Sequence, residues 1–384
     1  MRVFRHPALC GLALLGTLAA GCSKDLKVGA VISQSGSVSP YGEQVKKGLD
    51  LAEEEINAGG GINGGTIQLI YKDDATNSDV GRRVVQELID TEGVGVIIGA
   101  ISSHVTLQIA PICEERGVVL LSPSASAPQI SQAGDFVFRN YPSDILEGTA
   151  MAEFARDLGL ERVVIFAMDN DFGRGLTEVF SGKYESKFRK VVQTFELQGD
   201  DTTGFTSLVA EAKKLDPDGI YIVSYVRELA ELLKALKAAN IKAMLLSSSS
   251  VTHDVAQLAG DAAELLVYPQ PSFDPDSHDE DVSRFVEAYK AKYGEVPEIY
   301  AAHGYDALKL VKQAVENYGS THPDSIKLGL ASVRDFKGAA GRTSFDENGD
   351  VVRYPRLFVI FRGESTPYQQ FVDDGGSLFS RHRS

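Results

Sequence analysis

The chain has 384 residues, of which 43% are hydrophobic and 24% are charged. This composition is typical of a globular protein long enough for two domains, and it excludes a disordered or low-complexity chain. The formal net charge of −15 argues against a nucleic-acid partner, because phosphate binding needs clustered Lys and Arg and the sequence has no such cluster.

The first 22 residues have the organisation of a secretory signal. Arg2 and Arg5 precede an apolar stretch that is too short to span a bilayer comfortably, and small residues then lead to Cys22. The sequence LAAGC at 18–22 resembles the lipobox of bacterial lipoproteins. We therefore expect residues 1–21 to be a signal peptide and Cys22 to carry a lipid that anchors the chain in the periplasm or at the cell surface. An ordinary signal peptide with an incidental cysteine is the alternative.

Strands and helices alternate from residue 26 onward. The apolar runs are short, continuous and rich in β-branched residues, which is typical of parallel strands buried on both faces. The helical segments carry apolar residues on one stripe, so the series predicts a doubly wound α/β sheet. In this first series we expect strands at 27–33, 66–74, 94–100 and 118–122, and helices at 41–57, 78–93 and 102–117.

A second series of the same kind follows residue 144, and two series predict two lobes. The proline-rich segment 268–277 has the composition of a linker that carries the chain back, and helices are expected at 279–293 and 299–317. Residues 343–361 are expected to form a hairpin that turns at Asn348 and Gly349. The expected strands of the second series are 162–168, 191–197, 219–225 and 242–248.

Small hydroxyl residues follow several strands of the first series. Ligands of open α/β sheets bind beyond the carboxyl ends of the strands, and the sequences ISQSGSVSPYG, AISSH and SPSASAP lie there. Ser102 and Ser103 also open a helix, whose N-terminus suits an anion such as a carboxylate. A helix cap and a plain loop are the alternatives for each segment alone, and their convergence on one edge favours a binding site.

Five segments in register carry a family resemblance. KVGAVISQSGSVSPYGEQVKKGLDLAEEEINAGGGING, VGVIIGAISSH, LLSPSASAPQIS, FVFRNYPSD and LAGDAAELLV resemble the periplasmic solute-binding proteins of ABC importers, of the leucine/isoleucine/valine-binding type. The resemblance implies a type I, Venus-flytrap fold, with two Rossmann-like lobes that have parallel sheets and are joined by a hinge of three crossovers. It places lobe 1 at 26–141 plus 272–343, and lobe 2 at 142–271 plus 344–384.

The same resemblance implies the site residues. Ser103 and Ser126 match hydroxyls that hold the ligand carboxylate, and Ser124 matches a backbone contact beside them. Three aromatic residues match the walls of the cleft: Tyr41, Phe172 and Tyr225. The expected function is capture of a branched-chain or other small amino acid, by a monomer that presents it to an ABC permease.

One departure from the family puts the ligand in doubt. Relatives often carry a carboxylate after the strand at 242–248, where it pairs with the ligand ammonium, and this chain has Ser248 or Ser249 there. Asp144 matches an acidic residue near the crossover between the lobes and could hold an ammonium, although capping the following helix is an equally good account. Either Asp144, Asp171 or Glu228 replaces the missing partner, or the ligand is an acid or amide without an α-amine.

Other classes of function have weaker support. The sequence lacks the G-x-S-x-G, Walker A, H-E-x-x-H and paired C-x-x-C signatures, so we expect no enzyme, no cofactor and no metal. His104 is expected to be structural or solvated, the acidic segment 278–281 to start a helix, and 346–350 to form a turn instead of a calcium loop. Cys113 is expected to be a buried thiol. A sensory ligand-binding module of the same fold remains an alternative to an importer.

Overall fold

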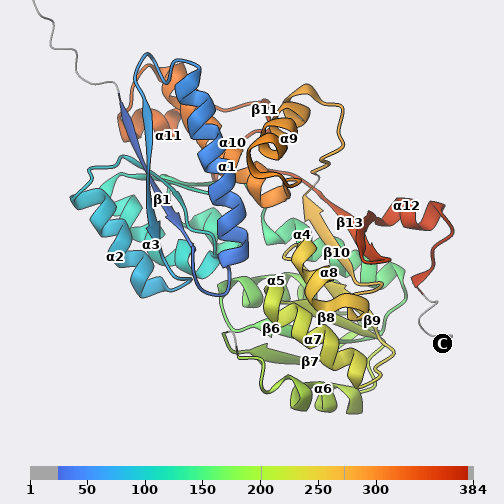
Figure 1. Ribbon diagram of the computed structural model, residues 1–384. Coiled ribbons are helices and arrows are strands. Elements are labelled where there is room, and N and C mark those ends of the chain that lie inside the picture. The colour runs from blue at the N-terminus through green and yellow to red at the C-terminus, as the bar shows by residue number, and fades with distance from the viewer. Residues whose placement is uncertain (1–24, 200, 272, 379–384) are drawn as a thin grey trace, which may run out of the picture.

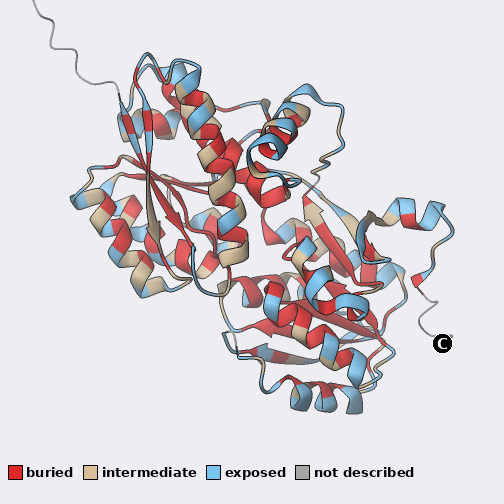
Figure 2. Ribbon diagram, in the orientation of Figure 1, coloured by how far each residue is buried: buried red, intermediate tan, exposed pale blue. Residues whose placement is uncertain are grey.

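The computed structural model describes residues 25–199, 201–271 and 273–378. The predicted signal peptide and Cys22 lie outside the described residues. The chain folds into two lobes, each an α/β sheet covered by helices (Figure 1). The central strands of each sheet are buried, as the continuous apolar runs predicted, whereas edge strands are partly exposed and the helices expose one side (Figure 2). None of the described helices is long and apolar enough to cross a membrane.

The first sheet is parallel, with the strand order β2-β1-β3-β4-β5. Alternate side chains of its strands point to opposite faces of the sheet and belong to two separate hydrophobic clusters. Val31 and Ile97 pack with α2 and α3 on one face, while Val28 and Ile98 belong to the core on the face of α1. Its strands are β1 (Leu26–Ile32), β2 (Ile67–Asp73), β3 (Val96–Gly99), β4 (Val119–Ser122) and β5 (Val137–Arg139), and its helices α1 (Ser39–Ala58), α2 (Ser78–Asp90) and α3 (Ser103–Arg116).

The second sheet has seven strands in the order β14-β13-β10-β9-β8-β6-β7. The first five in chain order are parallel, whereas β13 runs antiparallel to β10 and to β14. The strands are β6 (Arg162–Met168), β7 (Lys190–Leu197), β8 (Gly219–Val223), β9 (Met244–Ser247), β10 (Val267–Pro271), β13 (Pro355–Phe361) and β14 (Glu364–Pro367). The helices are α4 (Asp144–Asp157), α5 (Asp171–Tyr184), α6 (Phe205–Lys214), α7 (Val226–Ala238), α8 (His253–Ala259) and α12 (Tyr368–Asp373), with a short 3-10 turn at Gly260–Ala262. Another 3-10 turn, Pro128–Gln132, lies between β4 and β5 of the first sheet.

The chain returns to the first lobe after β10. There α9 (Glu280–Tyr293), α10 (Ile299–Tyr318), α11 (Pro323–Ala331) and the small hairpin β11 (Phe336–Gly338) and β12 (Gly341–Thr343) complete that lobe (Figure 1). Helices α1 and α10 are in very close contact, because a Cβ atom on Gly48 would lie only 2.0 Å from the carbonyl oxygen of Ala301. This contact fixes the two helices relative to each other.

The C-terminal hairpin prediction is wrong in its strands. Asp346 accepts hydrogen bonds from the N–H groups of Asn348 and Asp350, so the turn forms, and Phe345 and Val351 make one isolated antiparallel bridge. The flanking strands pair elsewhere: β12 pairs with β11, and β13 pairs with β10 and β14. The predicted linker at 268–277 is likewise partly strand β10. Tertiary pairing of β13 with β10 decides both outcomes, and the local turn sequence does not encode it.

The turn before β13 is bound to the first lobe. The buried Arg139 guanidinium at the end of β5 makes two hydrogen bonds to the Asp350 carboxylate, with N to O distances of 2.6 and 2.8 Å. Phe345 packs edge to face against Phe138 of the same strand. The chain therefore passes between the lobes near three sites: after β5, after β10 and before β13. The residue boundaries expected for the two lobes stay a prediction.

Candidate functional site

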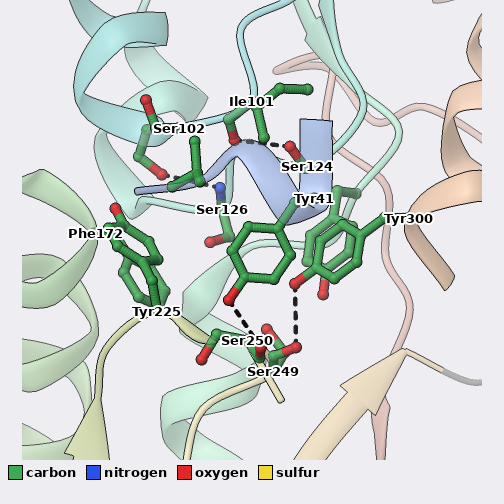
Figure 3. A pocket seen from close by; sticks show the side chains of 13 residues that line it. Tyr41, Ile101, Ser102, Ser124, Ser126, Phe172, Tyr225, Ser249, Ser250 and Tyr300 are labelled. Carbon is green, nitrogen blue, oxygen red and sulfur yellow. Dashed lines mark hydrogen bonds between the residues drawn. The ribbon is translucent and has the colours of Figure 1, made fainter. Parts of the chain in front are cut away.

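A small cavity lies between the two lobes, at the carboxyl ends of the parallel strands. Its volume is about 40 Å³, and the side chains that line it are all uncharged hydroxyl, aromatic or aliphatic groups (Figure 3). The hydroxyl groups of the loops after β3 and β4 lie on one side, and the aromatic rings on the others. Six of the expected site residues line this cavity: Tyr41, Ser103, Ser124, Ser126, Phe172 and Tyr225.

The N-terminus of α3 forms the polar end of the cavity. Ser102 occupies the N-cap position, yet its Oγ makes no hydrogen bond although the residue is only 4% exposed. The first intrahelical N–H bond is that of Thr106 to the Ser102 carbonyl, so earlier N–H groups of this 14-residue helix have no intrahelical acceptor. Unbonded N–H groups and the helix dipole together suit an anionic group.

The other serine hydroxyls beside this helix are partly engaged. Ser103 Oγ accepts hydrogen bonds from the backbone N–H groups of Ser126 and Ala127, at 3.2 and 3.1 Å. Its own hydrogen stays available for donation to a carboxylate. Ser124 donates its hydroxyl hydrogen to the carbonyl oxygen of Ile101 at 2.7 Å, which fixes the loop after β4 against the loop after β3.

Aromatic rings from both lobes form the remaining walls. Phe172 stacks on Tyr225 with ring centroids 5.6 Å apart, and Asn170 donates a hydrogen bond to the Tyr225 hydroxyl. Tyr41 lies 4.7 Å from Tyr300 between ring centroids. Sequence reasoning missed Tyr141 and Tyr300, which also line the cavity and stack on each other. The only sequence feature that could have indicated Tyr300 is its place as an aromatic residue in the first turn of a predicted helix.

The loop between β9 and α8 connects the lobes at this cavity. Tyr41 of α1 donates a hydrogen bond to the carbonyl oxygen of Ser250 at 2.8 Å, and Tyr300 of α10 donates one to that of Ser249 at 3.1 Å. The backbone N–H of His253, at the start of α8, donates to Glu298 in front of α10 at 3.2 Å. Burial raises the pKa of Glu298 to about 6. Side chains of α1 and α10 thus contact this loop of the second sheet beside the cavity (Figure 3).

Asp144 lies behind the cavity and does not line it. The residue is fully buried, neither carboxylate oxygen has a hydrogen-bond partner among the described residues, and its backbone N–H donates to the Ser126 carbonyl at 2.8 Å. Burial raises the pKa of Asp144, and the nearby Ser126 side chain and Arg139 charge oppose that rise. Ser143 is the N-cap of α4 and accepts from Ile145, so the interpretation of Asp144 as the helix cap is wrong.

Glu147 is a second buried acid that the sequence interpretation missed. It lies one helical turn after Asp144, and its Oε1 accepts a hydrogen bond from the N–H of Ser249 at 2.9 Å. Burial raises the pKa of Glu147, and the neighbouring Asp144 carboxylate raises it further. No sequence signal indicated this contact, because Glu147 lies within a regular helix and its partner Ser249 is 102 residues away.

The other carboxylates considered as ammonium partners also lie outside the cavity lining. Asp171 is paired with Arg174, with an O to N distance of 3.4 Å. Glu228 is buried in the first turn of α7, where its charge raises the pKa of Tyr225 after the larger effect of burial. Ser249 and Ser250 line the cavity, whereas Ser248 bonds to the Ser250 hydroxyl behind it.

The residues considered for metal binding or catalysis lie elsewhere. His104 contacts the Thr76 carbonyl at 3.0 Å, and Asp279 caps α9 by accepting from Asp281 and Val282. Within the described ranges, no group of three or more His, Cys, Asp or Glu side chains could hold a metal ion. Burial raises the pKa of the Cys113 thiol to about 12, which disfavours the reactive thiolate near neutral pH.

Comparisons with known proteins find a likeness that covers most of the chain. The family model described as "Periplasmic binding protein" matches residues 25–364. The leucine-, isoleucine-, valine-, threonine-, and alanine-binding protein of Pseudomonas aeruginosa is 27% identical over 92% of this chain and 93% of its own length. A leucine-binding protein from Thermotoga maritima has a similar structure, with a TM-score of 0.83, 28% identity, and coverage of 89% of this chain and 97% of that one.

A solute-binding protein of an ABC transporter from R. palustris, solved with benzoate, has a TM-score of 0.82 at 24% identity. The match covers 89% of this chain and 95% of that one. This likeness concerns the fold.

Proposed function

The chain belongs to the periplasmic binding protein family, as its sequence resemblance predicted, and on that basis we propose that it captures a small carboxylate-bearing solute for an ABC importer. Its fold is the type I, two-lobed α/β fold of the structures that it resembles. The relatives named above are binding proteins, which supports a binding role in preference to catalysis. The proposed location is extracytoplasmic, as for other members of this family.

The observation that carries the proposal is the meeting of Ser102, Ser103 and Ser126 with the N-terminus of α3 at a cavity between two lobes. The ligand carboxylate is proposed to bind there, with Ser124 holding the adjacent loop in place. Hydroxyl donors and free N–H groups at a helix N-terminus stabilise a negative charge without a buried cation. The aromatic walls are proposed to contact the ligand's apolar part: Tyr41, Phe172 and Tyr225.

The proposed motion is closure of the two lobes over the ligand. Lobe 1 would comprise 26–141 plus 272–343, and lobe 2 would comprise 142–271 plus 344–384. A ligand that touches both lobes binds the closed state better than the open state, and only this difference in affinity drives closure. The closed monomer would then be the form that the permease recognises.

Two ligand classes remain in the proposal. Relatives whose names specify leucine, isoleucine and valine favour a branched-chain or other small amino acid. The uncharged lining of the cavity favours an acid without an ammonium group, and a benzoate complex of the same fold gives a precedent for such a ligand. The carboxylate is common to both classes.

A thermal-shift screen of the purified protein tests the carboxylate. Leucine, isoleucine, valine, their deaminated analogues, aromatic acids and short amides form the panel, and benzyl alcohol and 3-methylbutanol are controls that lack the carboxylate. A ligand that binds only the folded state at about 100 times its Kd adds about 2.7 kcal/mol to the free energy of unfolding. At least one carboxylate should therefore raise Tm while the alcohols leave it unchanged. Shifts with amides or alcohols alone would overturn the proposal.

A further inference from the structure

The cavity provides for a negative charge but for no positive one. At its polar end are an unbonded Ser102 hydroxyl and the first N–H groups of α3. Every residue that lines it is uncharged. An ammonium group enclosed here would lose its hydration without gaining an ionised partner, and such burial is unfavourable.

The nearest acids cannot supply that partner by direct contact. Asp144 and Glu147 are absent from the lining, and Asp144 is fully buried behind it. Glu228 is also absent from the lining, and Asp171 is directed toward Arg174. A solute within the cavity therefore meets hydroxyl, amide and aromatic groups before any carboxylate.

Asp144 and Glu147 are nonetheless coupled to the cavity through its lining residues. The N–H of Asp144 donates to the carbonyl of Ser126, which lines the end with the hydroxyl groups. The carboxylate of Glu147 accepts from the N–H of Ser249, which lines the opposite side. One turn of α4 thus places two buried carboxyl groups directly behind two parts of the binding surface.

The surroundings of this pair do not neutralise two negative charges. The Arg139 charge acts on Asp144, but its guanidinium is bound to the Asp350 carboxylate. Where α4 packs on α5, Gly148 faces the apolar Leu176 and Val179. Among the described residues, four phenols whose pKa burial raises also interact electrostatically with the pair: Tyr141, Tyr221, Tyr225 and Tyr300. Burial raises the pKa of both carboxyl groups, and the Asp144 charge raises that of Glu147 further, so protonation of the pair is favoured toward neutral pH.

We propose that the ligand is a carboxylic acid without an α-ammonium group, and that the Asp144–Glu147 pair takes up a proton when the ligand's carboxylate binds. The inference rests on the proposed function, because it assumes a carboxylate at the α3 N-terminus. A bound anion next to Ser126 disfavours ionised Asp144, and a proton from the buffer then restores the charge balance. A zwitterion would bring its own compensating positive charge and would take up no proton.

Isothermal titration measures both parts of the inference. Leucine and 4-methylpentanoate form a matched pair that differs by the amine, and benzoate is the aromatic probe. Each is titrated into the purified protein at pH 7.5 in phosphate and in Tris, whose different ionisation enthalpies report the number of protons exchanged. We expect 4-methylpentanoate or benzoate to bind at least about tenfold more tightly than leucine, with net proton uptake of up to about one proton.

Variants separate the pair from the rest of the site. Asp144→Asn should abolish or strongly reduce proton uptake, whereas the control Asp171→Asn should retain it. If Asp144→Asn does not fold, Glu147→Gln is used, and it should reduce the uptake. Tighter binding of leucine would overturn the ligand class, and uptake that is unchanged in the pair variants would overturn the role of the pair. Binding of none of the carboxylates would overturn the proposed function itself, and with it this inference.

Discussion

Ser102 and Ser103 are adjacent in the chain, but their hydroxyl groups have different partners. Ser103 Oγ accepts from two backbone N–H groups, those of Ser126 and the buried Ala127. Ser102 Oγ has no protein partner among the described residues. A hydroxyl that satisfies buried donors contributes to folding stability, whereas one without a partner contributes little. Ser103 therefore has a structural role besides its proposed ligand contact.

At the residue scale, Ser103→Ala and Ser102→Ala should separate stability from binding. Ser103→Ala leaves two buried N–H groups without an acceptor and should lower the free energy of unfolding by about 1–3 kcal/mol. Ser102→Ala should change it by less than about 0.5 kcal/mol while still weakening carboxylate binding. Urea denaturation and isothermal titration measure the two effects. Equal losses of stability in both variants would contradict the assigned hydrogen bonds.

At the element scale, the loop between β9 and α8 is held from two sides. Glu147 and the carbonyl of Ser224 fix its Ser249 and Ser250 from within the second lobe. Tyr41 and Tyr300, on two tightly packed helices of the first lobe, donate hydrogen bonds to its carbonyl oxygens. In the proposed closing motion, these bonds would form in the closed state and would stabilise it independently of any ligand.

Tyr41→Phe should weaken binding of every ligand by the same factor. Loss of one hydrogen bond between the lobes costs about 1 kcal/mol, or about fivefold in Kd, because fewer molecules are closed. Tyr293→Phe is the matched control, since its hydroxyl donates to the Lys47 carbonyl within the first lobe. Titration with several ligands gives the factor, and small-angle X-ray scattering gives the closed fraction. A changed ligand ranking with an unchanged closed fraction would instead mean that the Tyr41 hydroxyl contacts the ligand.

At the scale of the whole molecule, the chain crosses between the lobes repeatedly, and the crossings are tied together. The Arg139–Asp350 ion pair joins the strand before the first crossing to the turn before the last one, 211 residues further along the chain. Segments distant in sequence therefore form a single connection on which the lobes are proposed to move. The proposed lipid at Cys22 would fix this two-lobed body to a membrane at its N-terminal end.

Replacement of Cys22 tests the anchor. Cys22→Ser removes the proposed site of lipid attachment, so the variant should be released into the soluble extracytoplasmic fraction. The wild-type chain should sediment with membranes and dissolve only in detergent, because buried acyl chains bind it to the bilayer. Cys113→Ala is the control, since this buried thiol lies away from the N-terminus and should leave the wild-type distribution unchanged. A soluble wild-type chain would favour the ordinary signal peptide with an incidental cysteine.

Much of the fold follows from local sequence pattern. The helix expected at 41–57 is observed at Ser39–Ala58, and the strand expected at 27–33 at Leu26–Ile32, because apolar periodicity and uninterrupted β-branched runs reflect burial within one element. The serines of the cavity were also identifiable, since carboxyl ends of parallel strands meet at one edge whatever the details of packing. The position of these residues directly after β3 and β4 was therefore enough to predict the polar side of the site.

The tertiary structure decided which residues reach the cavity and from which lobe. Tyr41 and Ser250 are 209 residues apart, and no local pattern encodes their hydrogen bond. Tyr141 and Tyr300 enter the site, while Asp144 lies behind it, because the relative placement of two lobes determines which side of a helix turn faces a shared cavity. The strand pairing of β13 was decided in the same way, because its partner β10 lies far from it in the sequence. Contacts between distant segments depend on the packing of whole elements, and that packing is a property of the complete fold.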